Sequence, residues 1–142
     1  MGQQKIVKIY HHPVRVDPQD IDAMGHINNV SYVAWMQEAA IAHSTANGWD
    51  LARYQSFGAG WVARKHRIEY LRPGFQEDDL MVQTWVFGLK RVSSTRRYHV
   101  VRASDQAVIA KAETQWAFVD LLTQTPRKIP PEISQSFEVI EF

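Results

Sequence analysis

The apolar and polar positions divide the chain into one helical segment and several segments with strand periodicity. Apolar residues recur on every side of the stretch from about Asn29 to about Asn47, which predicts a helix of roughly five turns. Asparagine is a favoured cap at a helix start, and Gly48 suits the left-handed position that often ends one. A helix that is apolar nearly all round is expected to be buried, so we expect the rest of the chain to wrap around it.

Strand periodicity precedes and follows this helix. Alternating apolar and polar positions predict strands over residues 5–16, 61–71, 80–89, 92–103 and 107–119. Short turns between the last four favour antiparallel hairpins. Pro13 removes a backbone donor and so favours an edge or a bulge for the first strand. Residues 51–54 form a possible helical turn, and the C-terminal residues hold one more possible strand or arm.

These elements predict an α+β fold with a single domain over residues 1–142. A small sheet covers a helix only if it curves strongly around it. The edges or faces that stay exposed are then expected to pair with a second copy of the chain. The sequence therefore predicts a curved antiparallel sheet wrapped around one central helix, in at least a homodimer.

Composition and charge exclude several functional classes. The formal net charge of +1 gives no bias toward nucleic acid. The absence of cysteine excludes disulfides, thiolate metal sites and a cysteine nucleophile, and the six histidines lack metal-binding spacing. The N-terminus lacks the apolar stretch of a signal peptide, and no apolar run reaches the length of a membrane span. We expect a cytoplasmic protein with no metal, membrane or nucleic-acid partner.

The most informative motif lies between the first strand and the helix, where residues 20–32 read D-x-D-x-M-G-H-x-N-N-x-x-Y. This string resembles the 4-hydroxybenzoyl-CoA thioesterase-like family of hotdog-fold proteins. Residues 68–74 (IEYLRPG) and 127–131 (RKIPP) resemble later segments of that family, so the likeness covers about residues 10–134. It implies a hotdog fold, a homodimer or homotetramer, no cofactor, and hydrolysis of an acyl-CoA or acyl-carrier thioester.

The resemblance assigns the catalytic carboxylate to Asp22, which either attacks the thioester carbonyl or deprotonates water. Backbone N–H groups near Asn28 to Val30, at the helix N-terminus, suit the carbonyl oxygen as it gains charge. Gly25 allows a sharp turn, and a histidine in the loop orients water or holds the loop. We therefore expect a catalytic set and two substrate contacts from this motif: Asp22, Gly25, His26 and Asn29, with Asn28 and Tyr32 beside the substrate.

Each carboxylate also has a structural interpretation. Asp22 is alternatively a turn or helix-start carboxylate, and Asp17 and Asp20 are favoured as turn formers or solvated charges. Glu38 lies on the apolar helix, where a buried carboxylate needs a partner, so a structural hydrogen bond is favoured there. It remains the second candidate base, because other hotdog enzymes place a carboxylate on this helix.

Coenzyme A carries phosphates, so cationic side chains are expected where it enters its site. Basic residues gather on the strand over 61–71 and around the strand over 92–103, including Arg96 and Arg97. From these we expect phosphate contacts by Arg64, Lys90 and Arg91. The alternative for each is a solvated charge that guards a sheet edge against aggregation.

The leading hypothesis is an acyl-CoA thioesterase. A non-catalytic module that binds an acyl ligand or a protein partner is the alternative, because a fold alone does not fix the chemistry. An enzyme that acts on the acyl chain, such as a hydratase, ranks lowest because the motif is that of thioesterases. The sequence leaves open the acyl group, CoA or acyl carrier protein, and nucleophilic or general-base catalysis.

Overall fold

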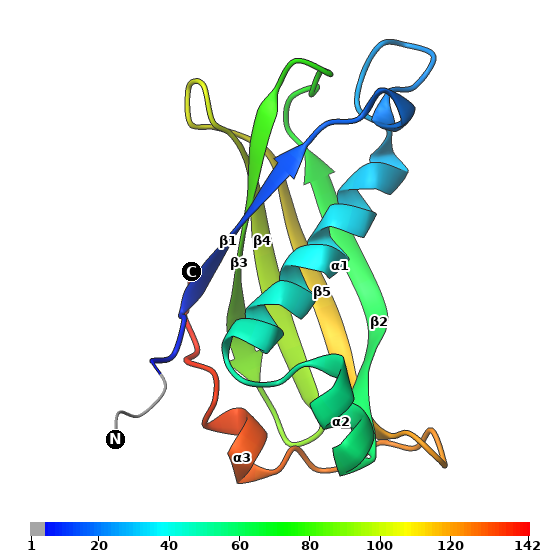
Figure 1. The fold of residues 1–142 in the computed structure, drawn as a ribbon, viewed down its shortest axis with the longest axis vertical. Coiled ribbons are helices and arrows are strands. Elements are labelled where there is room, and N and C mark those ends of the chain that lie inside the picture. The colour runs from blue at the N-terminus through cyan, green and yellow to red at the C-terminus, as the bar shows by residue number, and fades with distance from the viewer. Residues whose placement is uncertain (1–4) are drawn as a thin grey trace.

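The computed structural model describes residues 5–142 as a five-stranded antiparallel sheet with one long helix across a face (Figure 1). In sheet order the strands are β1 (Ile9–Arg15), β3 (Asp79–Leu89), β4 (Ser93–Arg102), β5 (Ala107–Asp120) and β2 (Ala59–Tyr70). The helices are α1 (Asn29–Ala46), α2 (Leu51–Phe57) and α3 (Pro131–Ser134), with a 3₁₀ turn, η1, at Pro18–Asp20. The predicted α+β architecture is confirmed.

The predicted hairpins form between β3 and β4 and between β4 and β5, but the predicted pairing of β2 with β3 is wrong, because the loop over residues 71–78 carries the chain from one edge of the sheet to β3 near the other. β3, β4 and β5 pair as consecutive antiparallel neighbours, β2 pairs with β5, and β1 pairs with β3. Pro13 lies opposite Met81 in β1, and β1 is an edge strand as its proline predicted. β2 forms the other edge, and its outer side has no partner strand within residues 5–142.

The core lies between α1 and one face of the sheet. Alternation along each strand puts apolar side chains on this face, and the core includes Tyr32, Trp35, Met36, Val82, Val100 and Ile109. A second cluster lies at the C-terminal end of α1, where α2 and α3 join the sheet, and it includes Trp49, Tyr54, Phe118 and Ile133. Both ends of α1 are thereby fixed to the sheet.

The expectation that α1 is buried all round is wrong for the single chain. Val30 is 73% exposed and Ile41 is 62% exposed, and Gln37 and Glu38 are also exposed. One sheet covers only one side of a helix, so the opposite apolar side of α1 stays open. The sequence predicted that exposed edges or faces would pair with a second copy, and this open side is one such face.

The helix boundaries agree with the predicted caps. The Asn28 side chain accepts the Val30 N–H at 3.0 Å, α1 ends before Asn47, and Gly48 has φ 93°. The C-terminal segment forms the short helix α3, which the sequence did not predict, and then an arm. Val139 bridges to Val86 at the edge of β3, beyond the end of β1.

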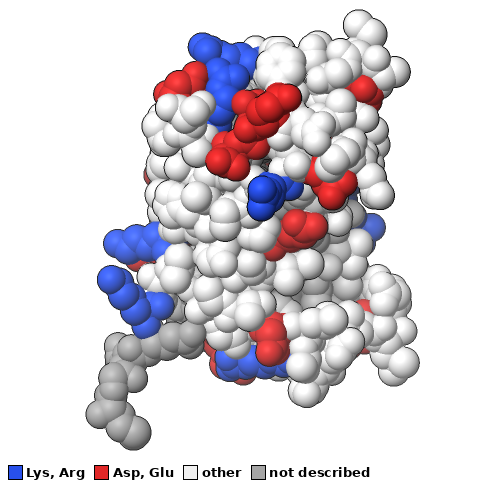
Figure 2. Space-filling model, turned by 45° about the horizontal axis from the view of Figure 1, so that its top comes forward, with Lys and Arg blue, Asp and Glu red and all other residues white. Residues whose placement is uncertain are grey.

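On the face shown in Figure 2, acidic and basic side chains are interspersed among broad uncharged areas. Within residues 5–142, none of the helices combines the length and the apolar character needed to cross a membrane.

Candidate active site

The loop between η1 and α1 is a tight hairpin that fixes the Asp22 carboxylate. Ile21 bridges to Ile27, and the Asp22 N–H donates to the His26 carbonyl at 2.8 Å. Gly25 takes φ 80°, a left-handed conformation that glycine adopts at little cost. Asp22 Oδ1 accepts the backbone N–H groups of Met24 at 2.9 Å and His26 at 3.1 Å. Its Oδ2 has no hydrogen-bond partner within residues 5–142, and the residue is exposed.

The other two loop carboxylates are occupied by local hydrogen bonds. Asp17 caps η1 by accepting the Gln19 N–H at 2.9 Å. Asp20 accepts the Asp17 N–H at 2.9 Å through one oxygen and the Ser31 hydroxyl at 2.8 Å through the other. The bonds between residues 17 and 20 stabilise the turn, which is the role that the sequence favoured for both residues. The bond from Ser31 joins η1 to the first turn of α1.

The first backbone N–H groups of α1 differ in whether they have an acceptor. The Asn28 N–H donates to the Asp20 carbonyl at 2.6 Å, and the Val30 N–H donates to the Asn28 side chain at 3.0 Å. The Asn29 N–H has no acceptor among the residues that the structure describes. Of the three amides that the sequence proposed, only that of Asn29 is therefore available to a ligand.

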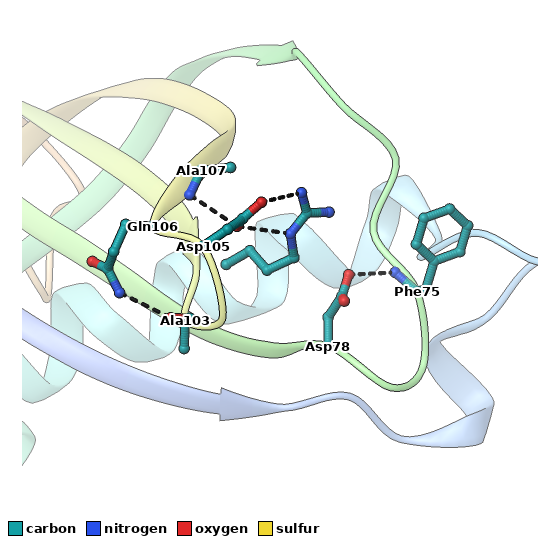
Figure 3. A network of polar contacts seen from close by, with 7 residues as sticks. Phe75, Asp78, Ala103, Asp105, Gln106 and Ala107 are labelled. Atoms are coloured by element: carbon teal, nitrogen blue, oxygen red, sulfur yellow. Dashed lines mark hydrogen bonds and ion pairs between the residues drawn. The ribbon is translucent and has the colours of Figure 1, made fainter.

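A second loop, between β2 and β3, supports the hairpin. The Ile27 N–H donates to the Gly74 carbonyl at 2.9 Å, and the His26 ring meets Phe75 edge-on at 5.4 Å. Asp78 accepts the Phe75 N–H at 2.9 Å and so closes this loop, beside the turn that contains Asp105 (Figure 3). His26 thus lies beside Asp22, held by its backbone and its ring.

Tyr32 lies in the core rather than on an open surface. It is 2% exposed, and its ring meets Trp35 at 5.6 Å and Tyr70 at 5.2 Å. Burial, with Tyr70 and Asp78 nearby, raises the pKa of Tyr32 to about 12, so the hydroxyl keeps its proton. Within the single chain, Tyr32 therefore has a packing role in the core and does not lie on an open surface that a substrate could contact.

The predicted phosphate contacts are not gathered at the loop. Arg64 is exposed in β2, and Lys90 and Arg91 are exposed in the turn between β3 and β4. β3 is 11 residues long, which corresponds to roughly 35 Å. The Asp22 hairpin follows β1 at one end of the sheet, so within one chain Lys90 and Arg91 lie at the opposite end.

Glu38 is not the buried carboxylate that the helix pattern suggested. Its side chain is 60% exposed and lies 3.5 Å from His12 Nε2 of β1. The open side of α1 explains the difference, because this residue points away from the sheet core. No group of three or more histidine, aspartate or glutamate side chains within residues 5–142 has the arrangement of a metal site.

A cavity of about 430 Å³ lies beside the C-terminal half of α1. Its lining is mostly apolar and comes from α1, α2, the four strands β2 to β5 and adjoining segments, including Ala40, Trp49, Trp61, Trp116, Leu121 and the arginine Arg96. Asn28 and Ala40 are about 18 Å apart along the helix, so the cavity and the hairpin are separate in one chain.

The expectation that Arg96 is one of the surface cations is wrong. The side chain is only 6% exposed and lines the cavity. The sequence pattern could have indicated this burial, because Arg96 alternates with Ser94, Tyr98 and Val100 along β4, and all four are buried on the same face.

Arg96 contacts the end of α1 through His43. The Arg96 Nη1 group donates to His43 Nδ1 at 2.8 Å, and His43 Nε2–H donates to the Val7 carbonyl at 2.6 Å. His43 is 1% exposed. Burial, reinforced by the Arg96 charge, lowers the pKa of His43 to about 4, so the imidazole is neutral at neutral pH.

Known proteins are similar to this chain in both sequence and architecture. Residues 16–137 match the family model of the Thioesterase-like superfamily. The acyl-CoA thioester hydrolase YbgC of Escherichia coli is 28% identical over 130 residues, which are 92% of this chain and 96% of that protein.

Solved structures confirm the fold. The DHNA-CoA thioesterase of Staphylococcus aureus aligns with TM-score 0.83 and 17% identity over 92% of this chain and 89% of that one. A protein of Lactobacillus plantarum assigned as an oleoyl thioesterase aligns with TM-score 0.87 and 21% identity over 95% of this chain, which spans 53% of that protein. With a family model matched over most of its length and a curved sheet around one long helix, the chain belongs to the Thioesterase-like superfamily and has the hotdog fold.

Proposed function

We propose that the protein is an acyl-CoA thioesterase in which Asp22 is the catalytic carboxylate. The observation that carries this proposal is the pair of unoccupied polar groups at the start of α1. Asp22 Oδ2 has no partner within residues 5–142, while its other oxygen is held by two backbone N–H groups. The Asn29 N–H, in the first turn of α1, also lacks an acceptor among these residues. The YbgC relative, named an acyl-CoA thioester hydrolase, supports the choice of substrate class.

These two groups supply what thioester hydrolysis requires. In the general-base route, Asp22 Oδ2 takes a proton from a water molecule whose oxygen attacks the carbonyl carbon. The carbonyl oxygen gains charge and accepts a hydrogen bond from the Asn29 N–H, where the helix dipole also favours negative charge. The C–S bond then breaks, and the thiolate takes up the proton from Asp22. In the nucleophilic route, Oδ2 attacks the carbonyl carbon, expels the thiolate and forms an anhydride that water cleaves.

A second copy of the chain completes the site in this proposal. The apolar cavity is large enough for an acyl group, but it lies near the end of α1 opposite to Asp22. The side of α1 that carries Val30 and Ile41 is open, and so is the outer edge of β2. A two-fold dimer with antiparallel α1 helices covers that side and directs Asp22 of one copy toward the cavity of the other. Arg64, Lys90 and Arg91 are the proposed phosphate contacts.

The test is thiol release from a panel of aromatic and aliphatic acyl-CoAs. Asp22→Asn should lower turnover by about 10²–10⁴-fold, the usual contribution of a positioned acid or base. Asp17→Asn is the matched control and should keep turnover, because asparagine caps a turn as well as aspartate. Unchanged turnover in a folded Asp22→Asn protein contradicts the assignment, and Glu38→Gln is then tested. Saturable binding without thiol release favours the binding-module alternative.

Mixed dimers test the shared site. Asp22→Asn removes the carboxylate, and Ala40→Phe obstructs the cavity from α1. If one copy supplies the carboxylate and the other supplies the cavity, mixing the two inactive proteins and allowing their subunits to exchange restores one intact site in each mixed dimer. Activity that stays absent after verified exchange places the carboxylate and the cavity of a working site in the same chain.

A further inference from the structure

Arg96 is a buried cation without a counter-charge. It is 6% exposed, yet no carboxylate of residues 5–142 lies within ion-pair distance of its guanidinium. Burial lowers the pKa of Arg96, because the charged form loses water, yet arginine retains its proton under ordinary conditions. A buried charge of this kind is costly unless a partner of opposite charge is supplied.

The guanidinium is held in place but only partly hydrogen-bonded. Its Nη1 group donates to His43 Nδ1 at 2.8 Å and to Thr84 Oγ1 at 3.1 Å. Both acceptors are neutral, since His43 donates its own proton to the Val7 carbonyl. The Nε and Nη2 groups form no hydrogen bond among the described residues. Two donor groups of a rigidly placed cation, Nε and Nη2, are therefore left for an acceptor.

Several other polar groups around the cavity are hydrogen-bonded to one another, although the Trp116 Nε1–H has no partner among the described residues. Trp61 Nε1 donates to the Tyr54 hydroxyl at 3.0 Å, and that hydroxyl contacts Ser44 Oγ at 3.0 Å. Ser44 Oγ donates to the Trp49 carbonyl at 2.7 Å. Arg96 is the one charged residue that lines the cavity, and the walls around it are largely aromatic and aliphatic. The cavity thus has mostly apolar walls and one charged side chain, the cation Arg96.

From this arrangement we propose that Arg96 determines specificity, and that the cavity takes acyl groups that carry a carboxylate at the end remote from the thioester. The apolar walls fit the methylene chain or ring of the acyl group. The planar guanidinium fits the carboxylate, which accepts its free N–H groups and neutralises its charge. This inference rests on the proposed thioesterase function and specifies its substrate class.

The experiment compares matched acyl-CoAs from four to ten carbons that end in a methyl, a hydroxyl or a carboxylate group. The wild type should prefer the carboxylate series in kcat/KM at the chain length that reaches Arg96. Arg96→Met keeps an unbranched, flexible stem but removes the guanidinium, and it should lower kcat/KM for that substrate at least about tenfold, as expected for a lost charged hydrogen bond. Its activity on the methyl-ended partner should stay within a few-fold.

Arg97→Met is the matched control. Arg97 is the next residue on β4, but it faces the other side of the sheet, where it pairs with Glu113 at 3.1 Å. Its replacement should leave the preference unchanged. Circular dichroism melting establishes that each variant is folded, and Arg96→Lys, which keeps the charge, should retain part of the preference.

Binding of the free acids separates this inference from the proposed function. Suberate should raise the melting temperature of the wild type more than the uncharged octanamide does, and this difference should vanish in Arg96→Met. This measurement needs no hydrolysis, so it decides the role of Arg96 even if every thioester is stable. Three results overturn the proposal: a preference for methyl or hydroxyl ends, a carboxylate preference that survives in Arg96→Met, or dissociation of Arg96→Met dimers, which assigns the cation to an interface ion pair.

Discussion

Protonation of His43 should destabilise the fold in mildly acidic solution. The imidazole is 1% exposed, and in its neutral form it accepts a hydrogen bond from Arg96 and donates one to the Val7 carbonyl. A second proton on Nδ1 would displace the arginine donor and place two cations side by side. The perturbation is therefore a shift from pH 7.5 to pH 4, compared between the wild type and His43→Gln.

The magnitude follows from the shift in pKa. The folded-state pKa of His43 is about 4, against an ordinary value of 6.5, chiefly because of burial and secondly because of Arg96. The unfolded chain therefore binds the proton first as the pH falls, and the stability present above pH 6.5 is lost progressively toward pH 4. A shift of about 2.5 units corresponds to about 3 kcal/mol, since one unit is worth about 1.4 kcal/mol.

Urea denaturation at half-unit steps between pH 7.5 and pH 4 measures this loss as a change in the free energy of unfolding. The wild type should lose about 3 kcal/mol more than His43→Gln over this window. Arg96→Met removes the second cause of the shift and should show a smaller loss than the wild type. Parallel pH profiles for the wild type and His43→Gln would refute the reasoning, because they would mean that His43 titrates equally in both states.

Three further predictions address the loop, the helix start and the assembly. Gly74→Ala should destabilise the fold by about 1–3 kcal/mol in urea denaturation, because a Cβ there would overlap the Ile27 side chain; an unchanged midpoint would contradict this packing. Asn28→Ala should cost about 1 kcal/mol in the same assay through loss of the α1 cap, with Asn28→Asp as the control that keeps it. Ile41→Glu should convert the proposed dimer to monomer in sedimentation analysis, whereas a dimer that persists would place the interface away from the open side of α1.

Much of the architecture was predictable because local signals and burial agree. The caps at Asn28 and Gly48 set the limits of α1, and Pro13 placed β1 at an edge. The period of two in the later segments predicted the four strands. The expected hairpins form between β3 and β4 and between β4 and β5, but β2 pairs with β5 instead of its sequence neighbour β3. The helix α3 was missed because its four residues carry too little periodicity to be distinguished from a turn.

The motif placed Asp22 and Asn29 at the start of a helix, and that position follows from sequence order alone. Which of their polar groups remain unoccupied depended on the hairpin, because Asp22 Oδ1 and the Asn28 and Val30 amides are consumed by local bonds. Only the folded loop shows that Asp22 Oδ2 and the Asn29 N–H remain unoccupied while these neighbouring groups are hydrogen-bonded.

The sequence by itself determined the order of the elements, the fold class and the carboxylate loop. The tertiary structure alone decided which side of α1 stays open, that Glu38 faces outward, and that Arg96 meets His43 inside a cavity. Periodicity indicates which residues share a face, but it does not reveal what lies opposite them. Arg96 and His43 are 53 residues apart in the chain, and only the packing of α1 against β4 brings their side chains within a hydrogen bond of each other.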